Sequence, residues 1–532
     1  MTTNKQSSRS LASIAGIVAA ATLVSKVFGL VREQIIAAAF GVGDVINAYA
    51  YAYVIPGFLL ILLGGINGPF HSALVSALSK RDKSEAAPIV ETVTTLVSLF
   101  LLLVTIITIV FAGTFIDLLG PQLTPDVRDI AILQLQIMAP IALLAGLIGI
   151  GFGTLNAHDS YLLPSISPLF SSVAVVISMA ALIWRAGEQL NTPQYVQTGA
   201  MVLAGATLAG AILQWLAQLI AQWRSGIGKL RLRFNWRIPG VMDVLKVMAP
   251  ATLSSGMLQI NVYTDLFFAS GIAGAAAAMR YANFIALTPL GIISNMILVP
   301  FLPVFSRLAA PENWQELKDR IRQGIFLSAL TMLPLTAIFT SLALPIIKLV
   351  YQRSQFDSDA SRFVAPLLMV YGLGMFFYLG RDVLVRVFYA LGDGETPFRI
   401  SIINIFFNAI FDYFLVKAFA APGLVLATIS VNITSMAIFI WILHRRLNGL
   451  PLLAWGKGIL GLVIASAFSG LTSWGISHSF EQFIGNDNLL LLLIELVISA
   501  IAALGIFVLI AMQFKLPELN MLATRIKQKI GR

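Results

Sequence analysis

Charged residues inside apolar stretches are the first candidates for chemistry in this sequence. The stretch 11–40 contains Ser25, Lys26, Arg32 and Glu33. Two helical turns place Ser25 with Arg32 on one face, and Lys26 with Glu33 on a neighbouring one. Because an ionisable side chain that faces lipid costs at least about 2.5–3.5 kcal/mol, we expect these residues to line a cavity and contact a substrate there. The alternative is that Arg32 and Glu33 lie near the outer mouth and extend to the membrane interface.

Other apolar stretches carry a second group of ionisable residues, which are Asp265, Arg280, Lys348, Arg381, Asp382 and Arg386. Arg280, Arg381 and Arg386 are candidates for substrate binding, and Asp265 and Asp382 for cation binding or gating. Asp382 and Arg386 are also i,i+4 neighbours, so a purely structural ion pair is the alternative. Asp265 has no basic neighbour within one turn and needs a partner from another helix or a cation. Lys348 lies at the outer end of its stretch, where we expect it to reach the interface.

Proline and glycine mark candidate hinges. Pro56 with Gly57, and Pro289 with Gly291, interrupt two apolar stretches and predict helix kinks, which could be hinges or static bends. The glycine-rich run 149–153 lies inside an apolar stretch with no strand before it. It therefore predicts close helix packing and not a nucleotide-binding loop.

Several classes of function are excluded by residue types. The chain has no Cys, which rules out disulfides, thiolate metal sites and cysteine nucleophiles. The four histidines are too scattered to predict a metal site; they are His71, His158, His444 and His478. No Walker A, metalloprotease or kinase motif is present, so we expect neither enzymatic activity nor ATP-driven transport by this chain.

Composition sets the class of the protein. Hydrophobic residues make up 58% and charged residues only 11%, whereas soluble domains carry roughly 25% charged residues. We therefore expect an all-α integral membrane protein with about fourteen transmembrane helices of about twenty or more residues each. The predicted spans lie near 11–40, 46–78, 89–118, 129–156, 161–184, 196–222, 241–270, 275–306, 323–351, 363–391, 397–416, 422–444, 455–477 and 488–513.

The basic residues predict the orientation. With a cytoplasmic N-terminus, most of the Lys and Arg fall in cytoplasmic segments: the N-terminal segment, the loops at 80–83, 224–237 and 307–322, and the tail from Lys515. The opposite side receives Arg128, Arg185, Arg353, Arg362 and Lys417. Both termini are thus expected in the cytoplasm. The net charge of +10 is explained by these loops, without nucleic acid.

The two halves of the sequence resemble each other. Pro56 and Pro289 are separated by the same offset as Pro164 and Pro397, each of the latter pair closing a similar turn. This predicts two parallel six-helix repeats with a substrate path between them. The expected divisions are a lobe at 1–222, a basic linker at 223–240, a lobe at 241–446, and two added helices with a basic tail at 447–532.

The run Ser25-Lys26-Val27-Phe28-Gly29-Leu30-Val31-Arg32-Glu33, followed by Phe40-Gly41, resembles the opening signature of the MurJ/MviN family of lipid II flippases. Pro250-Ala251 with Gln259 and Ala269-Ser270, and Phe388-Tyr389-Ala390-Leu391 through Thr396-Pro397, resemble further segments of that family. The resemblance implies a multidrug/oligosaccharidyl-lipid/polysaccharide exporter fold in the bacterial cytoplasmic membrane. It also implies export of a lipid-linked peptidoglycan precursor, with a cationic cavity for its head group and a groove involving the last two spans for its lipid tail.

The sequence departs from the family at two pairs of positions. Asn47 and Leu60 stand where many members have an acidic residue and an arginine, and Asn283-Phe284 stands where they have Asp-Arg. The cavity is therefore expected to be less basic. Arg280 lies one helical turn before Phe284 and could supply charge to the same face; the alternative is that it anchors its helix at the interface.

Three functions remain open at this point. The first is lipid II flipping by alternating access, for cell wall synthesis. The second is transport by the same superfamily of another polyprenyl-linked polysaccharide precursor, or cation-coupled export. The third is a membrane scaffold that has lost transport. No cofactor is expected, and coupling to membrane potential, H⁺ or Na⁺, the oligomeric state and the protein partners stay undetermined.

Overall fold

The computed structural model describes residues 3–65, 69–79, 81–158, 160–246, 248, 252, 260–485, 488–514 and 517–519. These residues form α-helices joined by short turns and two 3-10 segments, with no strand in the part described. The all-α prediction is confirmed. The chain forms two compact units. Unit 1 consists of residues 1–277 with 353–356, and unit 2 of residues 278–352 with 357–532. The lobe boundaries predicted at 222 and 240 come from the repeat and stay predictions.

Twelve helical segments in the described residues are long and apolar enough to cross a membrane. Each coincides with one of the predicted spans, so the chain is a multi-pass membrane protein. The predicted span 11–40 corresponds to α1 (Thr3–Phe40). The predicted span 241–270 ends in α12 (Ile260–Ala269), but Pro250, Ala251 and Gln259 lie outside the described residues.

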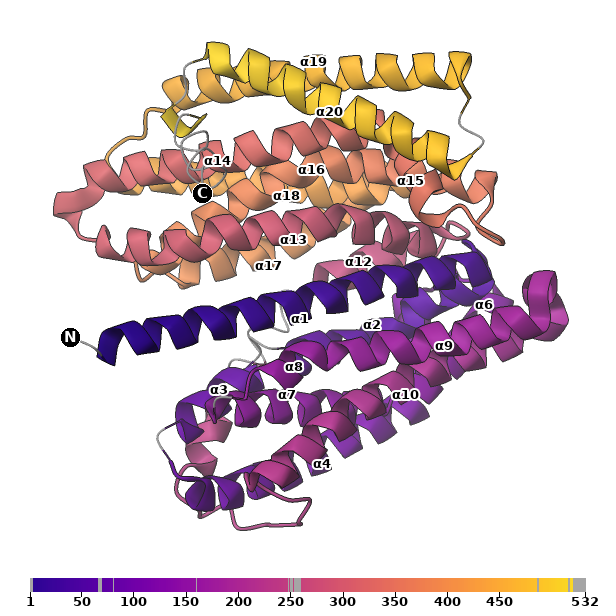
Figure 1. Cartoon of the computed structure of the whole chain (residues 1–532), viewed down its shortest axis with the longest axis vertical. Coiled ribbons are helices and arrows are strands. Elements are labelled where there is room, and N and C mark those ends of the chain that lie inside the picture. The colour runs from indigo at the N-terminus through magenta and orange to yellow at the C-terminus, as the bar shows by residue number, and fades with distance from the viewer. Residues whose placement is uncertain are drawn as a thin grey trace. The chain divides into compact units, whose positions relative to one another are not determined.

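Unit 1 contains α1 and α12 and the helices between them. Those with given bounds are α2 (Asp44–Gly64), α3 (Pro69–Leu78), α4 (Lys83–Val110), α5 (Ala112–Leu119), α6 (Pro125–Met138), α7 (Ile141–Ala157), α8 (Leu162–Ile166), α9 (Pro168–Ala186) and α10 (Pro193–Ser225), and residues 241–246 are helical as well. Proline begins α6, α9 and α10, at a position where its missing N–H has no helical partner to lose. The helix α2 packs against α6 and α7, and α1 runs along α8 and α9 (Figure 1).

The glycine-rich run in α7 allows neighbouring helices to approach closely. A Cβ at Gly149 would lie 1.9 Å from the Leu63 carbonyl oxygen, and one at Gly151 would lie 2.1 Å from Oε1 of Gln218. Both separations are shorter than any van der Waals contact, so only glycine fits at 149, against backbone, and a side chain at 151 would displace the Gln218 side chain. The predicted packing role of this run is confirmed.

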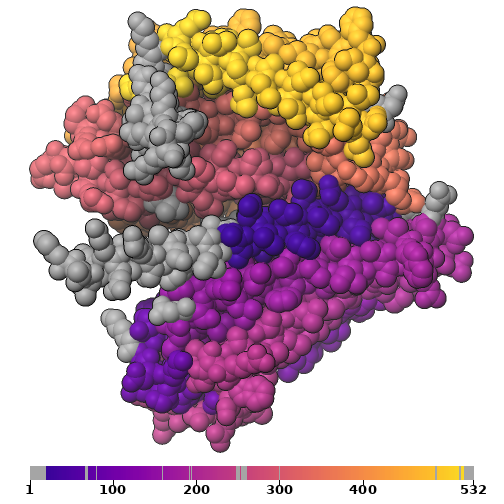
Figure 2. All heavy atoms as spheres, in the orientation of Figure 1, coloured from indigo at the N-terminus to yellow at the C-terminus, as the bar shows by residue number. Residues whose placement is uncertain are grey.

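Unit 2 contains α13 (Ala275–Arg307) from residue 278 and the longer α-helices that follow it in the described residues. These are α14 (Trp314–Ser341), α15 (Ala343–Tyr351), α16 (Ser358–Ala390), α17 (Glu395–Phe419), α18 (Ala421–Arg446), α19 (Leu452–Phe483) and α20 (Leu489–Gln513). The helix α16 packs against α14 and α18, and the α19–α20 pair packs against α14 (Figure 1). In Figure 2 this pair, in yellow, forms one face of unit 2. Many of its apolar side chains, such as Phe468 and Ile501, are exposed, as expected where lipid is the solvent.

Several long predicted spans are broken helices. The stretch 89–118 divides into α4 and α5 at Phe111, and 323–351 divides into α14 and α15 at Leu342. The two break residues have similar backbone angles, φ −101° and ψ 20° at Phe111, and φ −115° and ψ 19° at Leu342. Matching breaks at matching places in the two halves agree with the internal repeat.

Candidate functional site

Two ionisable residues of α1, Arg32 and Glu33, form an ion pair within unit 1. Arg32 donates from Nε and Nη2 to Oε1 of Glu33, at 3.2 and 2.9 Å. The Glu33 side chain is only 2% exposed, whereas that of Arg32 is 28% exposed. Because a buried carboxylate needs a compensating charge, Arg32 stabilises Glu33, and the Arg32 side chain stays partly exposed.

The other two candidates on α1 have different surroundings. The hydroxyl of Ser25 is half-buried and lies 3.5 Å from the carbonyl oxygen of Ser165, next to α8. Lys26 is exposed. The two basic candidates on α1 thus differ in exposure, since Lys26 is exposed and Arg32 is half-buried.

In α16 the candidate residues form a mixed-charge group. Arg381 pairs with Asp382 at 3.8 Å, and Arg386 lies one turn further along the helix and is half-buried. The group carries two arginines and one carboxylate, so it keeps an excess positive charge. Binding of an anion here stays a prediction.

The remaining predicted residues are distributed over both units. Arg280, on α13, is half-buried, and the ring of the next residue, Tyr281, lies 4.9 Å from that of Tyr351. Asp265, on α12 in unit 1, is half-buried. Lys348, on α15, is half-buried near the end of that helix.

The candidate hinges are prolines and glycines inside helices. Pro56 lies inside α2 and Pro289 inside α13. A Cβ at Gly57 would lie 2.5 Å from the Tyr53 ring, whereas one at Gly291 would meet nothing within 4 Å. Their role as hinges stays a prediction.

Asn47 replaces an acidic residue of the resembling family, and it has a defined role. Its side chain is 5% exposed, and its Oδ1 accepts a hydrogen bond at 3.4 Å from the backbone N–H of Ala277. Ala277 lies in the first turn of α13, where backbone N–H groups have no partner within the helix. Asn47 therefore satisfies a helix N-terminus.

Buried acids that the sequence analysis did not select also lie in apolar helices. Asp412 on α17 is fully buried and accepts a 2.7 Å hydrogen bond from Nδ2 of Asn408. Glu495 on α20 is 1% exposed and accepts one from Ser477 on α19. An acidic residue within an apolar span is itself a signal and could have been used to find both. Each could carry a proton or contact a cation, although no cluster of three or more metal-ligating side chains occurs among the described residues.

The turn between α16 and α17 is fixed by Asp393. Its carboxylate accepts hydrogen bonds from the Thr396 backbone and hydroxyl, at 2.9 and 2.8 Å, and from Arg446 at 2.7 Å. Burial raises the pKa of Asp393, but these hydrogen bonds and the Arg446 charge outweigh it and lower the pKa below its usual value. This turn belongs to the segment that resembles the MurJ/MviN family.

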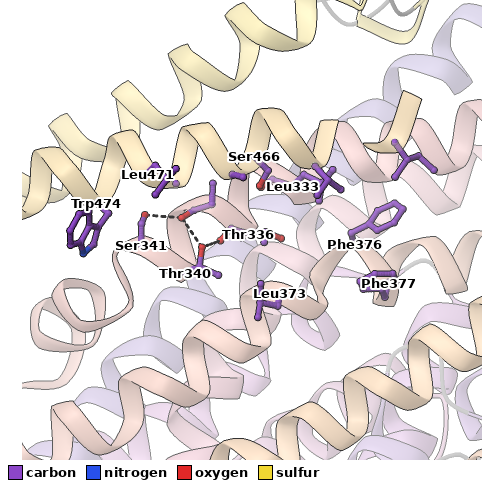
Figure 3. A pocket seen from close by; sticks show the side chains of 15 residues that line it. Leu333, Thr336, Thr340, Ser341, Leu373, Phe376, Phe377, Ser466, Leu471 and Trp474 are labelled. Atoms are coloured by element: carbon purple, nitrogen blue, oxygen red, sulfur yellow. Dashed lines mark hydrogen bonds between the residues drawn. The ribbon is translucent and has the colours of Figure 1, made fainter. Parts of the chain in front are cut away.

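A groove of about 690 Å³ lies among α14, α16 and α19 (Figure 3). Its walls are mainly apolar and include Leu333, Phe376, Leu471 and Trp474. The hydroxyl groups in the walls donate to backbone carbonyl oxygens, as Thr336 does to Gly372 and Ser466 does to Leu333. Because these hydroxyls are satisfied internally, the groove suits a hydrocarbon chain. The resemblance implied a groove on the last two spans, and this one uses α19 of those two.

Known proteins of one family are similar to this chain in sequence. A sequence model of the family described as "Lipid II flippase MurJ" matches residues 36–494. A protein of Synechocystis sp. named "Probable lipid II flippase MurJ" is 62% identical over 532 residues, which is 100% of both chains. A Burkholderia cenocepacia protein named "Lipid II flippase MurJ" is 26% identical over 483 residues, covering 88% of this chain and 89% of its own.

Two solved structures share the fold. The first, described as "Lipid II flippase MurJ, inward closed conformation", has a TM-score of 0.71 at 22% identity, covering 97% of this chain and 99% of its own. The second, an inward-facing MATE family multidrug resistance transporter, has a TM-score of 0.63 at 15% identity, covering 83% of this chain and 99% of its own. At these identities the likeness concerns the fold alone.

Proposed function

Because this chain belongs to the lipid II flippase MurJ family, we propose that it moves the lipid-linked peptidoglycan precursor lipid II from the inner to the outer leaflet of the cytoplasmic membrane. The observation that carries this proposal is the 62% identity over the full length of both chains. Flipping makes and breaks no covalent bond, so the protein acts as a transporter and not as an enzyme.

The charged residues of the spans suit the head group of such a substrate. A diphosphate that crosses the hydrocarbon region needs fixed positive charge in a hydrated cavity. The candidates to supply it are Lys26 and Arg32 on α1, Arg280 on α13, and Arg381 and Arg386 on α16. Arginine can hold two phosphate oxygens at once, which favours it for this task.

The groove on α14, α16 and α19 suits the lipid tail. Its lining hydroxyls already donate to backbone carbonyls, so a hydrocarbon chain leaves no buried polar group unsatisfied. The tail would stay in an apolar environment while the head group crosses the membrane by alternating access.

We also propose that both termini are cytoplasmic. The excess of Lys and Arg in the predicted cytoplasmic segments supports this orientation. The driving force is open among membrane potential, H⁺ and Na⁺. Asp265, Asp382 and Asp412 are the candidate carriers if an ion is coupled.

The test is depletion of the protein in its host, followed by quantification of lipid-linked intermediates. We expect lipid II to accumulate on the inner leaflet and wild-type protein to restore its transport. Accumulation of a different polyprenyl-linked glycolipid would transfer the proposal to that substrate. No accumulated intermediate at all would favour a scaffold that does not transport.

A further inference from the structure

The segment after α10 has an alternating sequence that the proposed flippase activity does not explain. Residues 229–237, which we call the basic strap, read Lys-Leu-Arg-Leu-Arg-Phe-Asn-Trp-Arg. The chain reaches the strap directly from a membrane-crossing helix, through Gly226 in the left-handed conformation at φ 72°. Trp223, in the last turn of α10, is exposed, as is typical of tryptophan at a membrane interface.

The strap is attached to α4 through alternate residues. The backbone N–H of Lys229 donates to Oε1 of Glu91 at 3.2 Å, and that of Arg233 donates to Oγ1 of Thr95 at 3.1 Å. Between them, the Thr95 hydroxyl lies 3.4 Å from the carbonyl oxygen of Arg231. The Lys229 N–H, the Arg231 carbonyl and the Arg233 N–H thus face α4, while the Arg231 N–H turns back to the Lys229 carbonyl oxygen at 2.8 Å.

A buried ion pair reinforces this attachment. Nε of Arg233 lies 2.9 Å from Oε2 of Glu91, whose side chain is 8% exposed. Glu91 therefore uses one oxygen for the strap backbone and the other for a strap side chain. The attachment fixes which way the remaining side chains of the strap point.

The apolar side chains of the strap are left uncovered. Leu230, Leu232, Phe234 and Trp236 are 64%, 79%, 63% and 62% exposed. Next to the end of a membrane-crossing helix, four large apolar side chains in one short segment match an element that lies in the membrane interface.

The basic side chains of the strap supply the complementary charge. Lys229, Arg231 and Arg237 are exposed, while Arg233 is neutralised by Glu91. Long Lys and Arg side chains can extend from an apolar anchor to the level of the lipid phosphates. Each basic residue near an anionic leaflet strengthens attachment by roughly fivefold.

We propose that the basic strap is a binding surface for anionic phospholipid. Leu230, Leu232, Phe234 and Trp236 insert into the interface, and Lys229, Arg231 and Arg237 contact the phosphate groups. The strap thereby ties α4 and the end of α10 to one leaflet. This inference rests on the strap alone and does not depend on which molecule the protein transports.

The absence of native cysteine allows a direct test of insertion. Single nitroxide labels would be placed at Leu230→Cys, Leu232→Cys and Lys229→Cys in the full chain, reconstituted in nanodiscs of phosphatidylcholine with or without phosphatidylglycerol. We expect the labels at 230 and 232 to be accessible to oxygen, and the label at 229 to a water-soluble nickel chelate. Equal exposure of all three labels to the nickel chelate, or spin–spin broadening from a second copy, would overturn the proposal.

A second measurement tests the charge. Arg231→Gln with Arg237→Gln should lower the preference of the reconstituted protein for phosphatidylglycerol over phosphatidylcholine by about 25-fold, or roughly fivefold per arginine. Arg307→Gln is the control, because Arg307 is also exposed and lies outside the strap. An unchanged preference in the double variant, or an equal loss in the control, would refute anionic lipid binding by the strap whatever the flippase assay gives.

Discussion

The Arg32–Glu33 pair allows the charge needed for transport to be separated from the charge needed for folding. Arg32→Ala removes the 2.9 Å ion pair and leaves the Glu33 carboxylate, 2% exposed, without it. Breaking a buried pair by removing one partner costs about 3–5 kcal/mol, and the 28% exposure of Arg32 places this case at the lower end. A loss of transport in Arg32→Ala alone could therefore come from unfolding.

The double variant Arg32→Ala with Glu33→Gln removes both charges together. We expect it to recover most of the stability lost in Arg32→Ala, because a neutral amide is far cheaper to bury than a carboxylate that has lost its guanidinium. Stability would be measured by denaturant unfolding in detergent, and transport by complementation of a flippase-depleted strain. If Arg32 contacts the diphosphate, the double variant is stable but inactive, whereas Arg32→Lys keeps part of the activity. A stable double variant that complements as well as wild type would remove Arg32 from the substrate site.

Four further outcomes are expected. Arg280→Ala should inactivate transport and the added change Phe284→Arg should restore part of it, because one helical turn moves a side chain only about 6 Å along the axis and about 40° around it; full activity of Arg280→Ala would indicate a simple interfacial anchor. Lys348→Ala, at the end of α15, should complement normally, and inactivity would place it in the transport path. Asp393→Asn should destabilise the protein by about 1–3 kcal/mol at neutral pH. Because the pKa of Asp393 is lowered in the folded state, wild type should exceed the variant in stability above the unfolded pKa near 3.9. This stability difference should vanish as the pH falls through the folded pKa. A cysteine at Asn235, which is exposed, should resist a membrane-impermeant reagent added from outside the cell, and labelling from outside would refute a cytoplasmic linker.

Hydropathy predicted the transmembrane helices because lipid leaves a chain few options. A backbone that crosses hydrocarbon must satisfy its own hydrogen bonds, so each apolar run of sufficient length becomes a helix. The same signal could not predict the breaks at Phe111 and Leu342, where neither break residue is a proline and the sequence stays apolar on both sides. Packing sets a helix break of this kind, and hydropathy averaged over a stretch of residues does not respond to packing.

Local spacing predicted which charged residues deserve attention, but not their partners. The i,i+4 rule drew attention to Asp382 with Arg386, whereas the ion pair in the structure joins Asp382 to the adjacent Arg381 at 3.8 Å. A long guanidinium can fold back along its own helix, and helix geometry alone does not forbid this. The attachment of Glu91 to Arg233 is harder still to predict, because it joins residues more than a hundred positions apart.

The differences from the resembling family at positions 47, 60, 283 and 284 are best considered as two pairs. Each pair loses one acid and one arginine of the resembling family, so the formal charge of the spans does not fall. At position 47, Asn47 supplies an oxygen to the N-terminal turn of α13. An amide oxygen accepts that hydrogen bond without needing a buried counter-charge. The sequence-based expectation of a less basic cavity follows only if the arginines are counted without their acids. When the acids and the arginines of these pairs are both counted, their net charge is zero. The positive charge that a diphosphate needs must then come from other residues, and Lys26, exposed on α1, is the first to test.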